Sequence, residues 1–176
     1  MQLPKLFARF LARRDGAVAV EFAIIAIPFF LIVLATLQTA ITYMAEQELE
    51  TAVEESSRLI LTNQGPNYTQ SQFTNAVCAE AVVLFNCSGL MVDVRNYGTG
   101  TGFSSAITSA PTLTYDSNGN VTNTWQFSPG VPGSIVVVRV MYQWPIFLKP
   151  FGFNLSNLPN GDRLIMATAV FRNEPS

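Results

Sequence analysis

The sequence predicts an α+β protein in which a long N-terminal transmembrane helix continues into a small antiparallel-sheet domain. An uncharged stretch covers residues 22–45, and beyond about residue 90 the apolar period changes from that of a helix to two. Only 12% of the residues are charged, about half the usual share. The 176 residues therefore divide into a basic cytoplasmic leader (1–16), a transmembrane helix (17–45) and an extracytoplasmic α+β domain (46–176).

The uncharged stretch is long enough to cross a bilayer. At a rise of 1.5 Å per residue it reaches about 36 Å, against a hydrocarbon core of about 30 Å. Four of the ten basic residues precede it, and five glutamates follow it between positions 46 and 55. By the positive-inside rule the N-terminus lies in the cytoplasm. A secretory signal peptide is the alternative, but its apolar core is only about 7–15 residues long and an Ala-x-Ala-like site should follow.

Helical spacing continues beyond the membrane as far as Gly65-Pro66. The residues at this spacing are Leu49, Ala52, Val53, Ser56 and Leu59 or Ile60. A first helix of about 45 residues is predicted, with this stripe buried against the outer domain and the glutamates on its solvated face rather than in a metal site. One helix would thus be both membrane anchor and part of a globular core.

A second helix is predicted from Gln70 to about Phe85, because Thr69 and Gln72 form the sequence pattern of a capping box. Its predicted inner face consists of Phe73, Val77, Ala81 and Leu84.

Strands are predicted for residues 90–97, 135–144 and 163–172, with a hairpin pairing 112–115 with 123–127 across Asn118-Gly119. Strict alternation over 135–144 predicts a half-buried antiparallel sheet, with Arg139 and Gln143 on the solvated face. The predicted inner faces are Val136, Val138, Val140, Tyr142 and Trp144 in one strand, and Ile165, Ala167, Ala169 and Phe171 in the last.

Composition excludes several kinds of chemistry. Histidine is absent, which removes the commonest general base and metal ligand, so we expect no metal site and no cofactor. No extended basic patch follows the leader, so we expect no nucleic-acid partner. Cys78 and Cys87 are nine residues apart in a domain assigned to an oxidising compartment, which predicts a disulfide; two buried thiols are the alternative.

The junction of leader and membrane helix carries the most informative residues. Glu21 lies in the first turns of the membrane helix, where a carboxylate needs a partner unless it reaches the headgroups as an interfacial acid. In the functional interpretation Gly16 ends a cleaved leader, because a residue without a Cβ lets a membrane peptidase approach the backbone. Cleavage would expose a new amine on Ala17, and Glu21 and Phe22 would become the fifth and sixth mature residues.

This junction resembles type IV prepilins of the Flp or Tad subclass and, more narrowly, the TadE-like pilus-assembly proteins, which are minor pseudopilins. The resemblance is carried by residues 13–23 with Pro28, by the two cysteines followed by 92–94, and by 169–175. The sequence departs from other type IV pilins at Ala17, where phenylalanine is common, and at Phe22, where tyrosine is usual.

The resemblance implies a pilin-like, minor pseudopilin-like structural subunit that assists assembly of a Tad/Flp adhesion pilus and catalyses no reaction. It implies residence in the bacterial inner membrane, with a prepilin peptidase, sister pseudopilins, the major Flp pilin, the inner-membrane platform and the lipid bilayer as partners. The large outer domain favours a minor role, since the family's major pilins are little more than the helix. The alternatives are an uncleaved membrane-anchored binding or sensor module and an anchored hydrolase, which would need a carboxylate pair or a Ser-Lys site.

Overall fold

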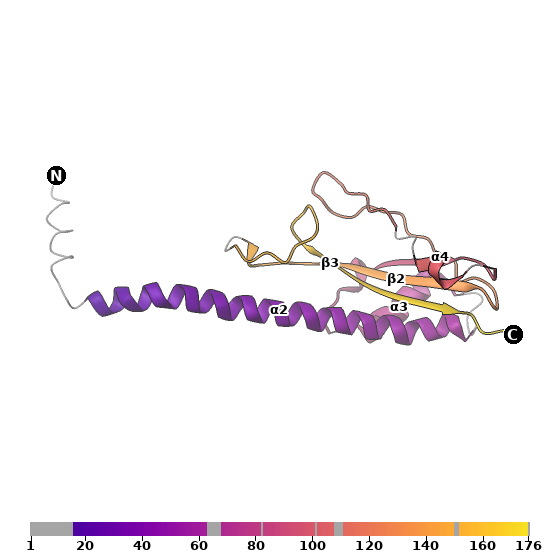
Figure 1. Ribbon diagram of the computed structural model, residues 1–176, viewed down its shortest axis with the longest axis horizontal. Helices are drawn as coiled ribbons and strands as arrows, with labels where there is room; N and C mark the ends of the chain where they lie inside the picture. Colours follow the sequence, from indigo (N-terminus) through magenta and orange to yellow (C-terminus); the bar gives the residue numbers. More distant parts are fainter. Residues whose placement is uncertain are drawn as a thin grey trace.

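The computed structural model describes residues 16–62, 68–81, 83–100, 102–107, 111–149 and 152–175. The elements are α2 (Ala17–Leu61), α3 (Gln70–Glu80), the 3-10 turn η2 (Cys87–Gly89), β1 (Met91–Asn96), α4 (Phe103–Ile107), β2 (Ile135–Trp144) and β3 (Arg163–Arg172). The predicted α+β fold, with a transmembrane-like helix leading into an antiparallel sheet, is confirmed (Figure 1). Residues 1–15 of the predicted leader lie outside the described residues.

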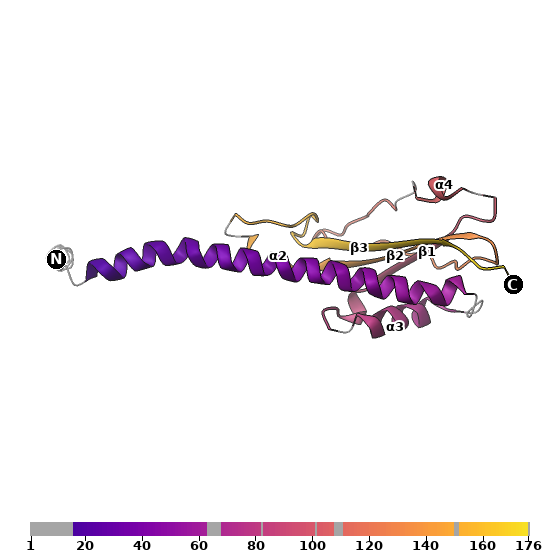
Figure 2. The ribbon, with the colours of Figure 1, turned by 60° about the horizontal axis from the view of Figure 1, so that its bottom comes forward.

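Helix α2 has the predicted length of 45 residues and remains helical across Pro28. Its first half projects alone, and its second half lies along the sheet (Figures 1 and 2). The predicted apolar stripe is confirmed, since the buried residues of the second half recur every three or four positions. They are Thr42, Ala45, Leu49, Ala52, Val53, Ser56, Ser57 and Ile60.

The sheet has the strand order β1-β2-β3, and both pairs are antiparallel. Strands β2 and β3 have the predicted bounds, while β1 is one residue shorter at each end than predicted. Val138 of β2 lies opposite Val94 of β1 and Ala169 of β3. The inner faces predicted for β2 and β3 both point into the core, so the predicted register is confirmed.

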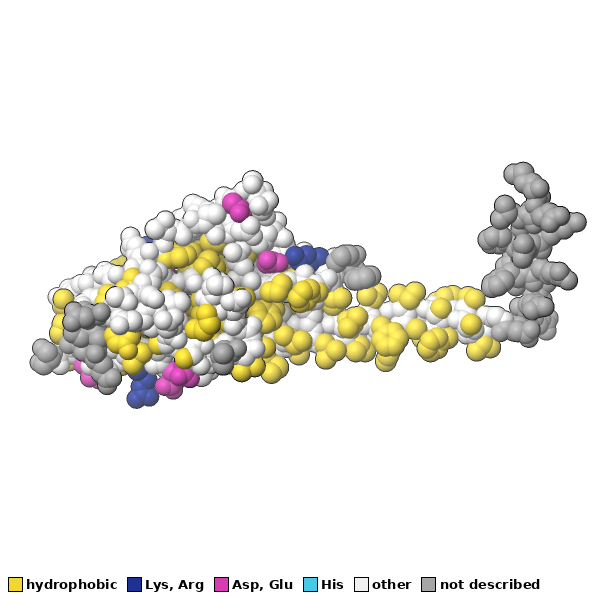
Figure 3. Space-filling model, turned by 180° about the vertical axis from the view of Figure 1, so that it is seen from behind, with side chains coloured by type: hydrophobic (Ala, Val, Ile, Leu, Met, Phe, Trp, Pro, Cys, Tyr) yellow, Lys and Arg dark blue, Asp and Glu magenta, His cyan; other side chains and the backbone are white. Residues whose placement is uncertain are grey.

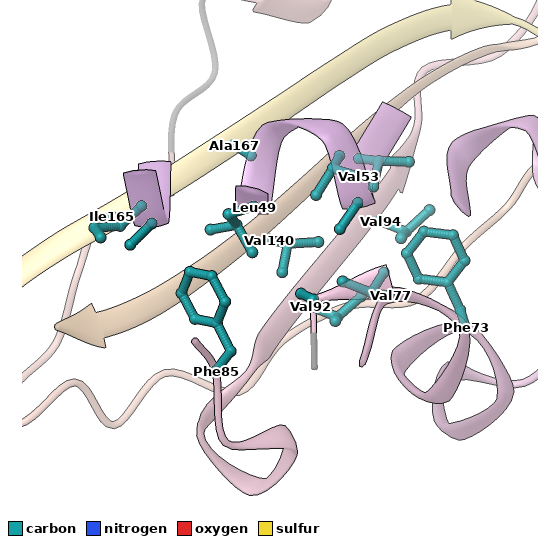
Figure 4. Packing of buried hydrophobic residues seen from close by; sticks show 14 of the residues in the cluster. Leu49, Val53, Phe73, Val77, Phe85, Val92, Val94, Val140, Ile165 and Ala167 are labelled. Atoms are coloured by element: carbon teal, nitrogen blue, oxygen red, sulfur yellow. The ribbon is translucent and has the colours of Figure 1, made fainter. Parts of the chain in front are cut away.

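The core fills the space between the sheet and helices α2 and α3, as Figure 4 shows for its central residues. Leu49 and Val53 of α2 meet Phe73 and Val77 of α3 above the valines of β1 and β2. All four helical residues are at most 1% exposed. The second half of α2 is thus a structural part of the outer domain, which cannot bury its sheet without it.

The opposite face of β2 is also covered, which corrects the prediction of a half-buried sheet. Ala106 of α4 packs on Ile135 and Val137, and Arg139 is only 3% exposed. Figure 2 shows α4 and the long connection between β1 and β2 on the side of the sheet away from α2 and α3. Alternation in a strand reports which residues share a face, but it does not report whether a loop crosses the second face.

Helix α3 ends at Glu80, not near Phe85 as predicted, although the predicted capping box of Thr69 and Gln72 is present. A helix continued to Phe85 would carry Cys87 about 13 Å along the axis from Cys78. The two Cα atoms are 5.5 Å apart, so the chain has to reverse. The reversal also lets Phe85 pack edge-on against Tyr142, with ring centroids 4.9 Å apart.

The predicted hairpin is present but short. Beyond its turn the backbone N–H of Thr122 donates to the Thr114 carbonyl at 2.9 Å, and the Asn123 side chain bonds to the backbone of Thr112 and Thr114. Gly119 has φ +81°, which suits glycine, and one antiparallel bridge joins Tyr115 to Val121. From Gln126 the chain runs beside β1 instead, with a parallel bridge between Val94 and Phe127. The end of the predicted second hairpin strand therefore pairs with the edge of β1.

Candidate functional site: the long helix and its anchorage

The first half of α2 is an apolar rod (Figure 3). One 18-residue window has a mean hydropathy of 2.7, and none of it is buried within the protein. The large apolar side chains more than half exposed here are Val18, Val20, Phe22, Ile24, Ile25, Ile27, Phe29, Phe30, Ile32 and Leu37. So continuous an apolar surface is unfavourable in water and requires lipid or protein around it. Of the helices that the structure describes, this is the one long and apolar enough to cross a membrane.

The threonine hydroxyl groups at residues 36–42 of this helix are satisfied within it. Thr36, Thr39 and Thr42 each donate to the backbone carbonyl four residues earlier, at 2.8, 2.9 and 2.9 Å. In a bilayer no water is available to such groups, so an internal acceptor removes most of the cost of placing them there.

Gly16 lies immediately before α2, with φ −90° and ψ −11°. A Cβ added at this position would meet nothing within 4 Å, and its backbone conformation is open to any L-residue. Neither packing nor backbone geometry therefore requires glycine here. Ala17 is the first residue of the helix.

Glu21 is exposed, and Phe22 beside it is 70% exposed. None of the four ion pairs found in the described part of the chain includes Glu21. Its carboxylate thus faces outward with the apolar rod, where it can meet a group on another molecule. The assembly roles of Glu21 and Phe22 and the cleavage at Gly16 stay predictions.

Two polar contacts fasten α2 to the outer domain at different heights. The Glu46 Oε1 atom accepts a hydrogen bond from Arg163 Nε at 2.9 Å, and Gln38 Oε1 accepts one from the backbone N–H of Leu148 at 3.1 Å. Of these two polar contacts, the one nearer the N-terminus is at Gln38, inside the predicted span 17–45. The sequence signal for this contact is the fall in apolar density after Ala35, where Gln38 is a long amide side chain within an otherwise apolar run.

The predicted glutamate run has two functions. Glu50, Glu54 and Glu55 are exposed, as expected for a solvated helix face. Glu48 instead accepts a hydrogen bond from the backbone N–H of Leu84 at 3.4 Å, and Glu46 forms the ion pair with Arg163. Among the described residues no group of histidine, cysteine, aspartate and glutamate side chains is arranged to hold a metal.

The disulfide between Cys78 and Cys87 is confirmed. It joins α3 to η2, and Asn86 caps that turn by accepting the N–H of Ser88 at 3.1 Å. The bridge holds the reversal after α3 in place, and with it the position of Phe85 beneath β2.

A buried charge cluster lies on the second face of the sheet, where the sequence analysis expected solvent. Asp93 is fully buried; its Oδ2 lies 2.8 Å from Arg95 Nε and 3.7 Å from Arg139 Nη1. Its Oδ1 accepts the backbone N–H of Gln126 at 3.1 Å, which fixes the connection between β1 and β2. The sequence signal for this cluster is a pair of opposite charges, Asp93 and Arg139, at facing positions of β1 and β2. This signal can be recognised only when the register of the two strands is known.

Comparison with known protein families gives a match that lies within helix α2 and the residue before it. Residues 16–58 match the family model described as TadE-like protein. This segment is TadE-like. The TadE-like segment begins at Gly16 and covers the exposed rod, Gln38 and most of the docked half of α2. The family resemblance stated from the sequence is confirmed over these residues, and the family suggests involvement in a Tad pilus system.

Comparisons with curated proteins and with solved structures found no match. The single long apolar helix is consistent with a single-pass membrane protein of such a pilus system.

Proposed function

We propose that the chain is a minor pseudopilin-like structural subunit that assists assembly of a Tad/Flp-type adhesion pilus and catalyses no reaction. The observation that carries the proposal is the division of the TadE-like segment into an exposed apolar half and a half built into the outer domain. Such a helix can pass from lipid into a bundle of similar helices without unfolding the domain that it carries. The subunit acts through helix packing and domain docking.

The proposed subunit crosses the bacterial inner membrane once, with its N-terminus in the cytoplasm and its domain in the periplasm. Its partners are the prepilin peptidase, sister pseudopilins, the major Flp pilin and the inner-membrane platform. The charge asymmetry around the apolar helix supports this orientation. The uncovered surface of the first half of α2 supports helical partners as well as lipid.

Processing after Gly16 is the first step of the proposed function. Glycine is not needed there by the fold, so its small size is available for peptidase recognition. Hydrolysis of the bond between Gly16 and Ala17 would release the leader and leave an ammonium group on Ala17.

Glu21 is the proposed partner of such an ammonium group on a neighbouring subunit. Along one helix Ala17 and Glu21 differ by about 6 Å in height, so the charges pair most directly between helices that are axially displaced. In surroundings of low dielectric constant the attraction is stronger than in water, but desolvation offsets much of it. The main product of the pair is therefore a defined stagger between subunits.

The experiment that tests this function is mass spectrometry of the mature protein, together with pili counted in a deletion strain that expresses each variant. A mature chain beginning at Ala17 supports the proposal. We expect Gly16→Lys to retain the leader, visible as a gel shift, and to abolish processing. An intact Met1 in cells that make normal pili would favour the alternative of an uncleaved anchored binding or sensor module.

A further inference from the structure

The geometry points to a second membrane contact: we propose that the loop of residues 145–149, with Phe147 at its tip, inserts into the outer interface of the bilayer beside α2. The loop follows β2 and reaches back along α2 toward the N-terminus (Figures 1 and 2). The proposal rests on the membrane-spanning part of the proposed function, but not on pilus assembly.

The height of the loop on α2 matches the edge of the hydrocarbon core. The backbone N–H of Leu148 donates to Gln38 Oε1, so the loop is tied to α2 at Gln38. Gln38 follows Ala17 by 21 residues, a rise of about 32 Å, against a hydrocarbon thickness of about 30 Å. The sequence has two arginines just before Gly16, so the positive-inside rule sets the inner boundary near Ala17 and the outer boundary at the level of the loop.

The loop presents an apolar side chain at this level. Ile146 is buried in the domain core, which turns its neighbour Phe147 outward, 76% exposed. Two residues further on, the Lys149 ammonium group forms an ion pair with Asp162 at 3.2 Å. The loop can therefore approach the bilayer without bringing an unpaired charge out of water. An exposed aromatic ring beside a compensated charge is suited to the headgroup boundary.

Apolar surface at this height occurs on two opposite sides of α2. On one side Leu34, Leu37 and Ile41 form a groove with Trp144, Phe147 and Leu148. On the other side a second groove joins Ile32, Ala35 and Tyr43 to Phe153. Residues 34, 37 and 41 lie about half a helical turn around from 32, 35 and 43. One partner helix would cover one groove, whereas lipid covers both, and both are continuous with the exposed apolar rod.

The test uses the full chain with one reporter thiol at a time. Both native cysteines are paired, so a single introduced cysteine is uniquely reactive. Phe147→Cys is compared with Ile27→Cys on the apolar rod, 64% exposed, and with Val131→Cys, 58% exposed. Val131 belongs to the other end of the domain, where its carbonyl accepts from Asn173 and the neighbouring Glu174 N–H donates to Leu61 at the end of α2.

Each variant is labelled with an environment-sensitive fluorophore and reconstituted in phosphatidylcholine vesicles that contain lipids spin-labelled on the acyl chain. We expect the labels at 147 and 27 to be quenched by these lipids and shielded from aqueous iodide. The label at 131 should show the reverse pattern. Intact disulfide and an unchanged circular dichroism spectrum verify that each variant is folded.

Three results would overturn the inference. If the label at 27 is quenched by lipid while 147 behaves like 131, the span stands and the loop contact is wrong. If 147 is shielded from both lipid and iodide, protein covers the loop instead. If neither 27 nor 147 is quenched by lipid, the membrane span fails and the proposed function fails with it.

Discussion

Arg139→Met is the substitution that most directly tests the buried charge cluster. It preserves much of the side-chain volume but removes the cation that lies 3.7 Å from Asp93. The Asp93 carboxylate is fully buried, so after the change it must be compensated by Arg95 and by the N–H of Gln126. The structure therefore reverses the sequence-based expectation that Arg139 lies on a solvated face.

Removing one partner of a buried ion pair costs about 3–5 kcal/mol in general. Here the cost should be smaller, about 2–3 kcal/mol, because Arg95 remains at 2.8 Å and because Arg139 Nη1 has no hydrogen-bond acceptor in the described part of the chain. The matched control is Arg172→Met, whose side chain is exposed at the end of β3 and should change stability by less than about 0.5 kcal/mol.

The assay is urea unfolding of the full chain in detergent micelles, followed by the fluorescence of tryptophan, since Trp144 is in the core. With a denaturant slope of about 2 kcal/mol per molar, the midpoint for Arg139→Met should fall by about 1 M. Replacing Asp93 by asparagine in the same chain should recover part of the loss, because the uncompensated charge is then gone. Equal midpoints for Arg139→Met and Arg172→Met would refute the reasoning.

Three further predictions concern the core, the disulfide and the helix. Val138→Asp places an unpaired carboxylate at a fully buried site and should prevent folding, whereas Val131→Asp in an exposed loop should melt like the unchanged protein. Replacing both Cys78 and Cys87 by serine should cost roughly 2–3 kcal/mol in thermal or urea unfolding, and two reactive thiols in denatured, unreduced native protein would contradict the bridge. Glu21→Gln should leave insertion, cleavage and domain folding intact while reducing the number of pili seen by microscopy; normal piliation would mean that Glu21 is an interfacial acid.

Local sequence patterns predicted the parts of the fold that depend on a long uninterrupted period. Strands β2 and β3 were predicted to the residue because alternation persists through ten positions in each. The length of α2 followed from its apolar spacing and the Gly65-Pro66 stop in the sequence. The capping box fixed the start of α3, but no stop signal of similar strength marks its end at Glu80.

The errors share one cause, which is that long-range contacts decided against a local preference. The end of the predicted strand 123–127 pairs with Val94 on the edge of β1 instead of continuing the hairpin. Arg139 has the alternation of a solvated residue, yet the β1–β2 register brings it opposite Asp93. Neither outcome can be read from a window of ten residues.

The residues of the candidate site could be predicted from the sequence, but the contacts that fix helix α2 to the domain could not. Gly16, Glu21 and the disulfide pair are distinctive within a short stretch, so sequence singled them out. The contact of Gln38 with Leu148 joins residues 110 positions apart and required the return of the chain after β2.

Anchorage gives the long helix a mechanical consequence in the proposed assembly. The outer domain is fixed to α2 at Gln38, at Glu46 and at the helix end, where the Leu61 carbonyl accepts the N–H of Glu174 at 3.0 Å. Contacts spread over these 24 residues, about 35 Å, prevent the domain from rocking or sliding independently of its helix. A change of one helical turn in the stagger of Glu21 between subunits would therefore move the whole outer domain by about 5.4 Å. In a bundle of such subunits, pairing at the membrane end of the helix would set which domain surfaces meet outside it.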